Sequence, residues 1–172
     1  LRYALETLGY SSFTYAENSA VALTMCRDKA FDLIICSFNL NCKDGYQLFE
    51  TLKAQQLLAP LSCFIMISAE NQRQTVHGMI ELQPDDYLLK PFTYQQLEQR
   101  ISRAIKSRIA LRKIYISLFE QDYHTAITEC DNAVAAKPEF ANAALRVKGE
   151  LLLKLKHYAD AELFYQQLLQ RQ

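Results

Sequence analysis

Several features that would point to particular functions are missing from this chain of 172 residues. The net charge is zero, with 19 basic and 19 acidic side chains, so the composition gives no reason to expect binding to nucleic acid or to an anionic membrane. The apolar runs are far too short to span a bilayer. We therefore expect a protein that binds neither nucleic acid nor membrane.

The five cysteines form no CxxC pair and have no spacing typical of metal ligands. Cys36 and Cys63 lie inside apolar runs, where a reduced thiol behaves as a small hydrophobic side chain. The odd number of cysteines and the lack of a signal segment together predict a reducing, cytoplasmic location. Because the chain begins at Leu1 in mid-helix pattern and without a methionine, we also expect it to be a fragment.

The first half of the chain alternates between helical and strand-like periodicity. We expect continuous apolar strands, separated by helices, which is typical of a parallel sheet covered on both faces. The expected helices lie at 1–8, at 19–31 with Asn18 or Ser19 as the N-cap, at a segment that opens at Asp44-Gly45 and carries Leu48, Phe49 and Leu52, and around 70–81. The expected strands lie at 12–16, 32–36, 63–68 and 86–89. The pattern predicts a doubly wound α/β sandwich.

After Pro91 the chain is helical in pattern. Residues 93–121 contain no Gly or Pro, and Thr93 with Gln96 forms a capping box, so we expect one long or barely broken helix there. Further helices follow, with breaks near Asp122, Pro138 and His157. We expect two domains, 1–106 and 107–172, the second all-helical.

The second domain contains an internal repeat. The segment "DYHTAITECDNAV" at 122–134 matches "HYADAELFYQQLL" at 157–169 with an offset of 35 residues. With two helices per unit and Pro138 ending the first unit, this period resembles that of tetratricopeptide (TPR) repeats. An ordinary pair of helical hairpins is the alternative interpretation.

The resemblance to TPR repeats implies that a small residue on the first helix of a unit packs against an alanine on the second. Gly149 and Ala161 hold these places in the second unit, while Ile114 with Ala126 is a poorer match in the first. A glycine in mid-helix costs roughly 1 kcal/mol relative to alanine, so close packing is a physical reason for Gly149.

In the first half, four segments occur in a known order and spacing: "YAENSAVAL", "DLIICSFNLNCKDGYQL", "MISA" and "PDDYLLKPF". Together they make residues 1–106 similar to the receiver domain of two-component response regulators. The resemblance implies a flavodoxin-like fold, a doubly wound parallel sheet, whose first strand is missing from this chain. It also implies that the protein takes part in bacterial phosphorelay signalling in the cytoplasm.

Receiver chemistry requires an acidic pair that holds Mg²⁺, an aspartate that accepts the phosphoryl group, and a hydroxyl and a lysine that bind its oxygens. By the resemblance, Ser37 occupies the aspartate position, Ser68 the hydroxyl position and Lys90 the lysine position, while Tyr87 is the aromatic switch residue. A serine hydroxyl brings no charge to a Mg²⁺ site and cannot form an acyl phosphate. We therefore expect a degenerate phosphorylation site with no cofactor, no Mg²⁺ and no catalytic residue.

The function we predict is that of a non-phosphorylatable receiver and TPR module that binds other proteins. The resemblance implies contacts through the face of the fourth helix, fifth strand and fifth helix of the receiver, which includes Tyr87, and through the TPR groove, with a homodimer as one option. The alternatives are an active response regulator phosphorylated on another carboxylate, such as Asp44, and an enzyme with Cys36 or Ser37 as nucleophile. We expect no enzyme, and a solvated turn at Asp85 and Asp86.

Overall fold

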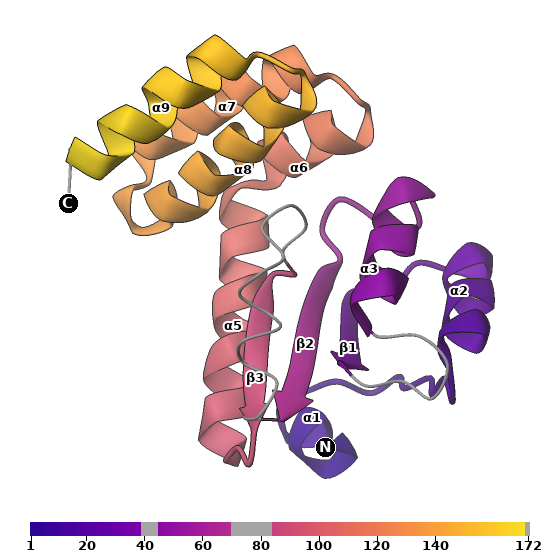
Figure 1. Ribbon diagram of the computed structural model, residues 1–172. Coiled ribbons are helices and arrows are strands. Elements are labelled where there is room, and N and C mark those ends of the chain that lie inside the picture. The colour runs from indigo at the N-terminus through magenta and orange to yellow at the C-terminus, as the bar shows by residue number, and fades with distance from the viewer. Residues whose placement is uncertain (39–44, 70–83, 171–172) are drawn as a thin grey trace. The chain divides into compact units, whose positions relative to one another are not determined.

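The computed structural model describes residues 1–38, 45–69 and 84–170 (Figure 1). The chain divides into two compact units, Leu1–Lys106 and Ser107–Gln172. The first unit contains a parallel sheet with helices, and the second unit is helical. The helix expected at 70–81 and the alternative acceptor Asp44 lie outside the described residues.

The sheet of the first unit consists of three parallel strands in the order β1-β2-β3. Strand β1 is Leu33–Ser37, β2 is Cys63–Ala69 and β3 is Asp86–Lys90. Residues 63–68 of β2 are all buried, as expected for a central strand covered on both faces. The three continuous apolar runs were therefore correctly predicted as strands of a parallel sheet.

The strand predicted at residues 12–16 is wrong. The structure assigns no strand there, and no described segment pairs its backbone with these residues. A strand exists only through hydrogen bonds to a neighbouring strand, and the described sheet ends at β1 on this side. Thr14 is instead held by its hydroxyl, which accepts a hydrogen bond of 3.0 Å from Lys29 Nζ.

Alternating side chains of β2 supply two separate cores, one on each face of the sheet. Cys63, Ile65 and Ile67 pack with helices α1 (Arg2–Thr7) and α5 (Tyr94–Ala110). Phe64 and Met66 point to the opposite face and pack with helices α2 (Ser19–Asp28) and α3 (Gly45–Ala54). This period of two is the property of a strand that allows one element to build both cores.

The helix boundaries of this unit follow local signals that the sequence contains. The side chain of Asn18 accepts a hydrogen bond from the backbone N–H of Val21, as an N-cap should. Thr93 and Gln96 form the predicted capping box, with backbone-to-side-chain bonds of 2.8 and 3.2 Å. Gly9 follows α1 with φ of +91°, a backbone conformation that favours glycine.

The second unit is a series of helices in which each packs on the next: α6 on α7, α7 on α8 and α8 on α9 (Figure 1). Their bounds are Arg112–Phe119 for α6, Tyr123–Ala136 for α7, Ala141–Lys154 for α8 and Tyr158–Gln170 for α9. A 3₁₀ turn at Pro138–Phe140 leads into α8, so the predicted breaks near Asp122, Pro138 and His157 are confirmed. Across the described residues, none of the helices is both long and apolar enough to cross a membrane.

The helix after residue 93, predicted to be long or barely broken, is broken at one residue, as that prediction allows. Helix α5 ends at Ala110 and α6 begins at Arg112, with Leu111 between them at φ of −99° and ψ of 19°. The carbonyl of Leu111 accepts a bond of 3.0 Å from Ile114 N, the shorter spacing of a 3₁₀ turn. Because Leu111 is neither Gly nor Pro, the sequence pattern did not show at which residue the helix breaks.

The first prediction concerns the close approach between Gly45 and the end of β1. A Cβ at position 45 would collide with the backbone carbonyl oxygen of Ser37 and lie 2.9 Å from Cys36 Sγ. Gly45→Ala should therefore lower the free energy of unfolding in urea by about 1–3 kcal/mol. Gly149→Ala is the matched control, because its Cβ would meet mainly the ring end of Tyr165, which is 40% exposed and can move. An equal loss in both variants would contradict this account.

The second prediction concerns pH. Burial raises the pKa of the Cys130 thiol to about 12, whereas an unfolded chain ionises it near 9. Since the folded state keeps its proton longer, the contribution of Cys130 to stability is complete below pH 9 and is lost as the pH rises toward 12. Between pH 8 and pH 10 the wild-type chain should lose roughly 1 kcal/mol that Cys130→Ala does not lose. Urea unfolding followed by circular dichroism measures both, and identical pH slopes would refute the prediction.

Candidate functional site

The three residues of the predicted degenerate site lie at one edge of the sheet. Because β1, β2 and β3 are parallel, their carboxyl ends meet at the same edge. The register pairs Ser37 with Ile67 and Lys90 with Ala69, so Ser68 of β2 lies between the two on the central strand. The structure therefore brings Ser37, Ser68 and Lys90 to the ends of three adjacent strands.

The backbone around Ser37 is held by the start of α3. The N–H of Gly45, the first residue of that helix, donates a bond of 2.7 Å to the carbonyl oxygen of Phe38. The N–H of Phe38 in turn donates a bond of 2.7 Å to Ile67 of β2. The chain after Ser37 is thus tied both to the central strand and to the helix that follows, and the half-buried Ser37 has little freedom to move away from the edge.

Ser68 and Lys90 differ in their surroundings. The Ser68 hydroxyl is buried, with the residue 3% exposed, and has no hydrogen-bond partner in the part of the chain that the structure describes. Lys90 is exposed, and among residues 1–38, 45–69 and 84–170 it makes no ion pair. Of Ser37, Ser68 and Lys90, only Lys90 has an ionisable side chain of ordinary basicity. In the described ranges, no group of three or more His, Cys, Asp or Glu side chains could hold a metal ion.

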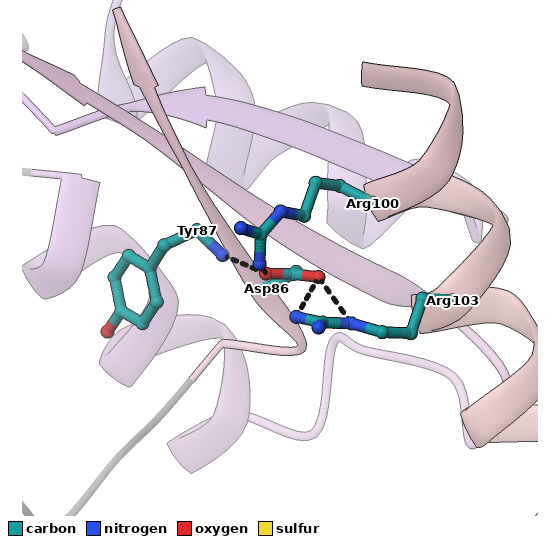
Figure 2. Close-up of polar contacts among 4 residues, drawn as sticks. All are labelled: Asp86, Tyr87, Arg100 and Arg103. Carbon is teal, nitrogen blue, oxygen red and sulfur yellow. Dashed lines mark hydrogen bonds and ion pairs between the residues drawn. The ribbon is translucent and has the colours of Figure 1, made fainter. Parts of the chain in front are cut away.

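The structure contains a second polar cluster, at the start of β3. The carboxylate of Asp86 receives bonds of 3.1 Å from Arg100 and of 2.7 and 3.1 Å from Arg103 (Figure 2). The side chain of Asp86 is 4% exposed, whereas those of Arg100 and Arg103 are 44% and 64% exposed. A buried carboxylate with two arginine partners fixes the start of β3 against α5.

This cluster also positions the predicted switch residue Tyr87. Its backbone N–H donates a bond of 2.8 Å to Asp86, and its half-buried side chain packs on the core beneath α2 and α3 (Figure 2). The side chain of Tyr87 and helix α5 therefore lie on opposite faces of the sheet. The carboxylate of Asp86 contacts both the backbone of Tyr87 and the arginines of α5.

The expectation of a solvated turn at Asp85 and Asp86 is wrong. Asp86 is buried by the two arginines, and the side chain of Asp85 accepts a bond of 2.7 Å from the backbone N–H of Phe64. The sequence analysis missed Arg100 and Arg103 as partners. A usable signal existed, because two arginines three residues apart lie on the same side of a helix that packs on β3.

The predicted repeat-packing residues are buried in the second unit. Ala126 and Ala161 are 0% and 2% exposed. Gly149 is also buried, but the nearest side chains to it are those of Tyr165 and Phe164 on α9. The glycine thus leaves room for an aromatic pair, whose ring centroids are 5.3 Å apart, and this is a more specific reason for it than contact with an alanine.

Comparison with known proteins finds similarity over the first unit. A family model described as the response regulator receiver domain matches residues 1–102. The chain is 26% identical to chemotaxis protein CheY of Pseudomonas aeruginosa over 103 residues, which cover 60% of this chain and 82% of that protein. Chemotaxis protein CheY-3 of Vibrio cholerae is 26% identical over 99 residues, 58% of this chain and 75% of that protein.

Comparison with solved structures also finds similarity over the first unit. A putative response regulator from Chloroflexus aurantiacus is 27% identical with a TM-score of 0.55, covering 61% of this chain and 84% of that one. The receiver domain of NtrX from Brucella abortus is 27% identical with a TM-score of 0.52, covering 60% and 84%. The matched residues of the family model end at position 102, so the model does not include the helices of the second unit.

The third prediction concerns the Asp86 cluster. Asp86→Asn keeps the shape of the side chain but removes the charge that two arginines share, so the free energy of unfolding should fall by about 1–3 kcal/mol. Urea unfolding measures the change. Glu6→Gln is the control, because its ion pair with Arg2 is exposed on both sides and should contribute nothing measurable. A similar loss in both variants would show that Asp86 acts as an ordinary surface charge.

Proposed function

This chain belongs to the response regulator receiver domain family, and on that premise we propose that it is a receiver that does not accept a phosphoryl group at position 37. In this proposal the receiver is joined to TPR-like helical repeats, and the two bind other proteins in two-component signalling in the cytoplasm. It acts by binding and is not an enzyme.

One observation carries the proposal: serine stands at the end of β1, at the edge where β2 and β3 place Ser68 and Lys90. The family's transfer reaction needs an aspartate at this place, since its carboxylate attacks phosphorus and the resulting acyl phosphate can be passed on. A serine hydroxyl has no negative charge for Mg²⁺ and lies at the end of a half-buried strand. Lys90 then has no carboxylate at position 37 as a partner.

Several observations support partner binding as the remaining role. Strand β3 carries the half-buried Tyr87 on one face of the sheet and packs against α5 on the other, and the buried Asp86 cluster fixes β3 to α5 (Figure 2). A fixed surface of this kind lowers the entropy that a partner must give up on binding. The fourth helix of the predicted partner face lies outside the described residues.

The repeat interpretation is supported by spacing and by packing. The 35-residue offset relates α7 to α9, and α8 to the segment that includes α6, so each repeat would consist of two helices. Helices whose main contacts are with their sequence neighbours are the arrangement expected of such repeats. We propose that the groove formed by the repeats holds a peptide or helix from another protein.

The fourth prediction tests the proposed receiver chemistry. The chain is incubated with acetyl phosphate and Mg²⁺, and its intact mass is measured beside that of a receiver that carries aspartate at the acceptor position. We expect no gain of mass for this chain, because Ser37 cannot form an acyl phosphate.

A hydroxylamine-labile gain of one phosphoryl group would refute the proposal. If Asp44→Asn then abolished that gain, the chain would be an active regulator that uses another carboxylate. If Asp44→Asn kept it, a different carboxylate would be the acceptor, and the same measurement on further Asp→Asn variants would locate it.

A further inference from the structure

The second unit contains two histidines whose imidazole rings lie against each other. His124 is the second residue of α7, and His157 directly precedes α9. Their ring centroids are 6.4 Å apart, and the ring planes are inclined by 44°. Both residues belong to the same compact unit, so their approach is a contact within that unit. The fold therefore brings together two nitrogen ligands from helices that do not follow each other in the chain.

The backbone at both histidines is held in place. The carbonyl of His157 accepts a bond of 2.9 Å from Ala161 N, within the first turn of α9. His124 lies in the first turn of α7, where the side chain of the N-cap Asp122 accepts a bond of 3.0 Å from Thr125 N. Ligands carried on ordered backbone lose little freedom when they bind an ion, and this favours binding.

The separation of the two rings is close to that of a two-histidine metal site. A metal ion bonded to two imidazole nitrogens at about 2 Å holds the ring centroids about 5 Å apart at a tetrahedral angle. From the observed 6.4 Å, each ring has to move by less than about 1 Å. Both histidines are exposed, so a small rotation of each side chain supplies this movement.

A carboxylate lies beside each ring. Asp160 Oδ2 is 3.9 Å from His157 Nδ1, and Asp122 interacts electrostatically with His124. In metal sites a ligating histidine commonly has a carboxylate at its other ring nitrogen, which orients the ring and makes it a better ligand. Because Asp160 lies on the Nδ1 side, Nε2 of His157 is the nitrogen that faces an ion. The two carboxylates also balance the charge of a divalent cation.

We propose that His124 and His157 together bind a divalent transition-metal ion of the kind that suits imidazole, such as Zn²⁺, Ni²⁺ or Cu²⁺. Water fills the remaining positions around the ion. Mg²⁺ does not bind here, because it requires oxygen ligands. Two protein ligands agree with the finding that no set of three or more His, Cys, Asp or Glu side chains in the described part of the chain could hold a metal. They make a site from which the ion exchanges.

A bound ion links the start of α7 to the start of α9. Helix α8 packs on both of these helices, so the ion holds all three in one arrangement. An ion that binds the folded chain more tightly than the unfolded chain stabilises the fold. The inference goes beyond the proposed function and uses none of the residues at the strand ends of the first unit.

The fifth prediction measures this binding by isothermal titration calorimetry with Zn²⁺ on the whole chain. The wild-type chain should bind one ion at this site. His124→Gln and His157→Gln should each weaken the binding by roughly tenfold or more, because a single imidazole remains. His77→Gln removes the third histidine of the chain and is the matched control, which should leave the affinity unchanged.

Two further measurements distinguish the histidine pair from adventitious binding. The electron paramagnetic resonance spectrum of bound Cu²⁺ should show two imidazole nitrogens in the wild-type chain and one in each single variant. Zn²⁺ should raise the urea midpoint of the wild-type chain but not that of the double variant His124→Gln/His157→Gln. In the calorimeter Cu²⁺ should bind more tightly than Ni²⁺ or Zn²⁺, and Mg²⁺ should not bind.

Several results would overturn the proposal. These are a wild-type chain that binds no Zn²⁺, a single variant that keeps the wild-type affinity, and a double variant that binds as the wild type does, which would mean adventitious binding only. A loss in His77→Gln as large as that in His124→Gln would also overturn it. Circular dichroism on every variant checks that the helices are retained.

The outcome is separable from that of the phosphorylation experiment. A chain that gains a phosphoryl group and also binds Zn²⁺ through His124 and His157 would refute the proposed receiver chemistry and leave the metal site standing. A chain that gains no phosphoryl group and binds no Zn²⁺ would do the reverse.

Discussion

The fold of the first unit depends on the pairing of β2 with a parallel strand on each side. The backbone of β2 pairs with both neighbouring strands through hydrogen bonds, and residues 63–68 are all buried. Because its side chains alternate, β2 supplies Ile65 to one core and Phe64 to the other. The same pairing brings the ends of three strands to one edge, so the place where Ser37, Ser68 and Lys90 meet is a consequence of backbone hydrogen bonds and not of the side chains themselves.

Under the proposed function, the separation between the backbone frame and the reacting side chain is what lets this receiver keep its architecture without an acceptor at position 37. Ser37 is half-buried and its carbonyl lies against Gly45, so the local packing involves the backbone of residue 37 more than its side chain. A carboxylate at this position would add charge but little to the packing. The family's reaction, in contrast, depends on that one side chain, so in our proposal a hydroxyl at position 37 changes the chemistry and leaves the sheet intact.

Much of this fold could be predicted from the sequence, for identifiable reasons. Continuous apolar runs placed β1, β2 and β3, and side-chain caps placed the starts of α2 and α5, because these signals are local. The prediction of a strand at 12–16 failed because strand pairing requires two segments, and the periodicity of one segment does not show that a second segment pairs with it.

The candidate site likewise combines local features that the sequence predicts with long-range contacts that it does not. The family pattern located Ser37, Ser68 and Lys90 at one edge, since each follows an apolar strand. It did not reveal that Asp86 is buried, because a pair of aspartates before a strand resembles a surface turn until the partners fourteen and seventeen residues later are considered. Long-range pairs between charged residues have no period, and this is why such clusters are found in structures sooner than in sequences.

The two repeats show how an internal comparison can recover part of that information. A single exposed residue such as Leu169 has no particular meaning, since isolated apolar side chains are common on protein surfaces. Its equivalent Val134, 35 residues earlier, packs on the core shared by α7 and α8. The internal comparison therefore identifies positions where a residue packed in one segment has an exposed counterpart of different chemistry in the other, Ile127 against Glu162 and Val147 against Arg112.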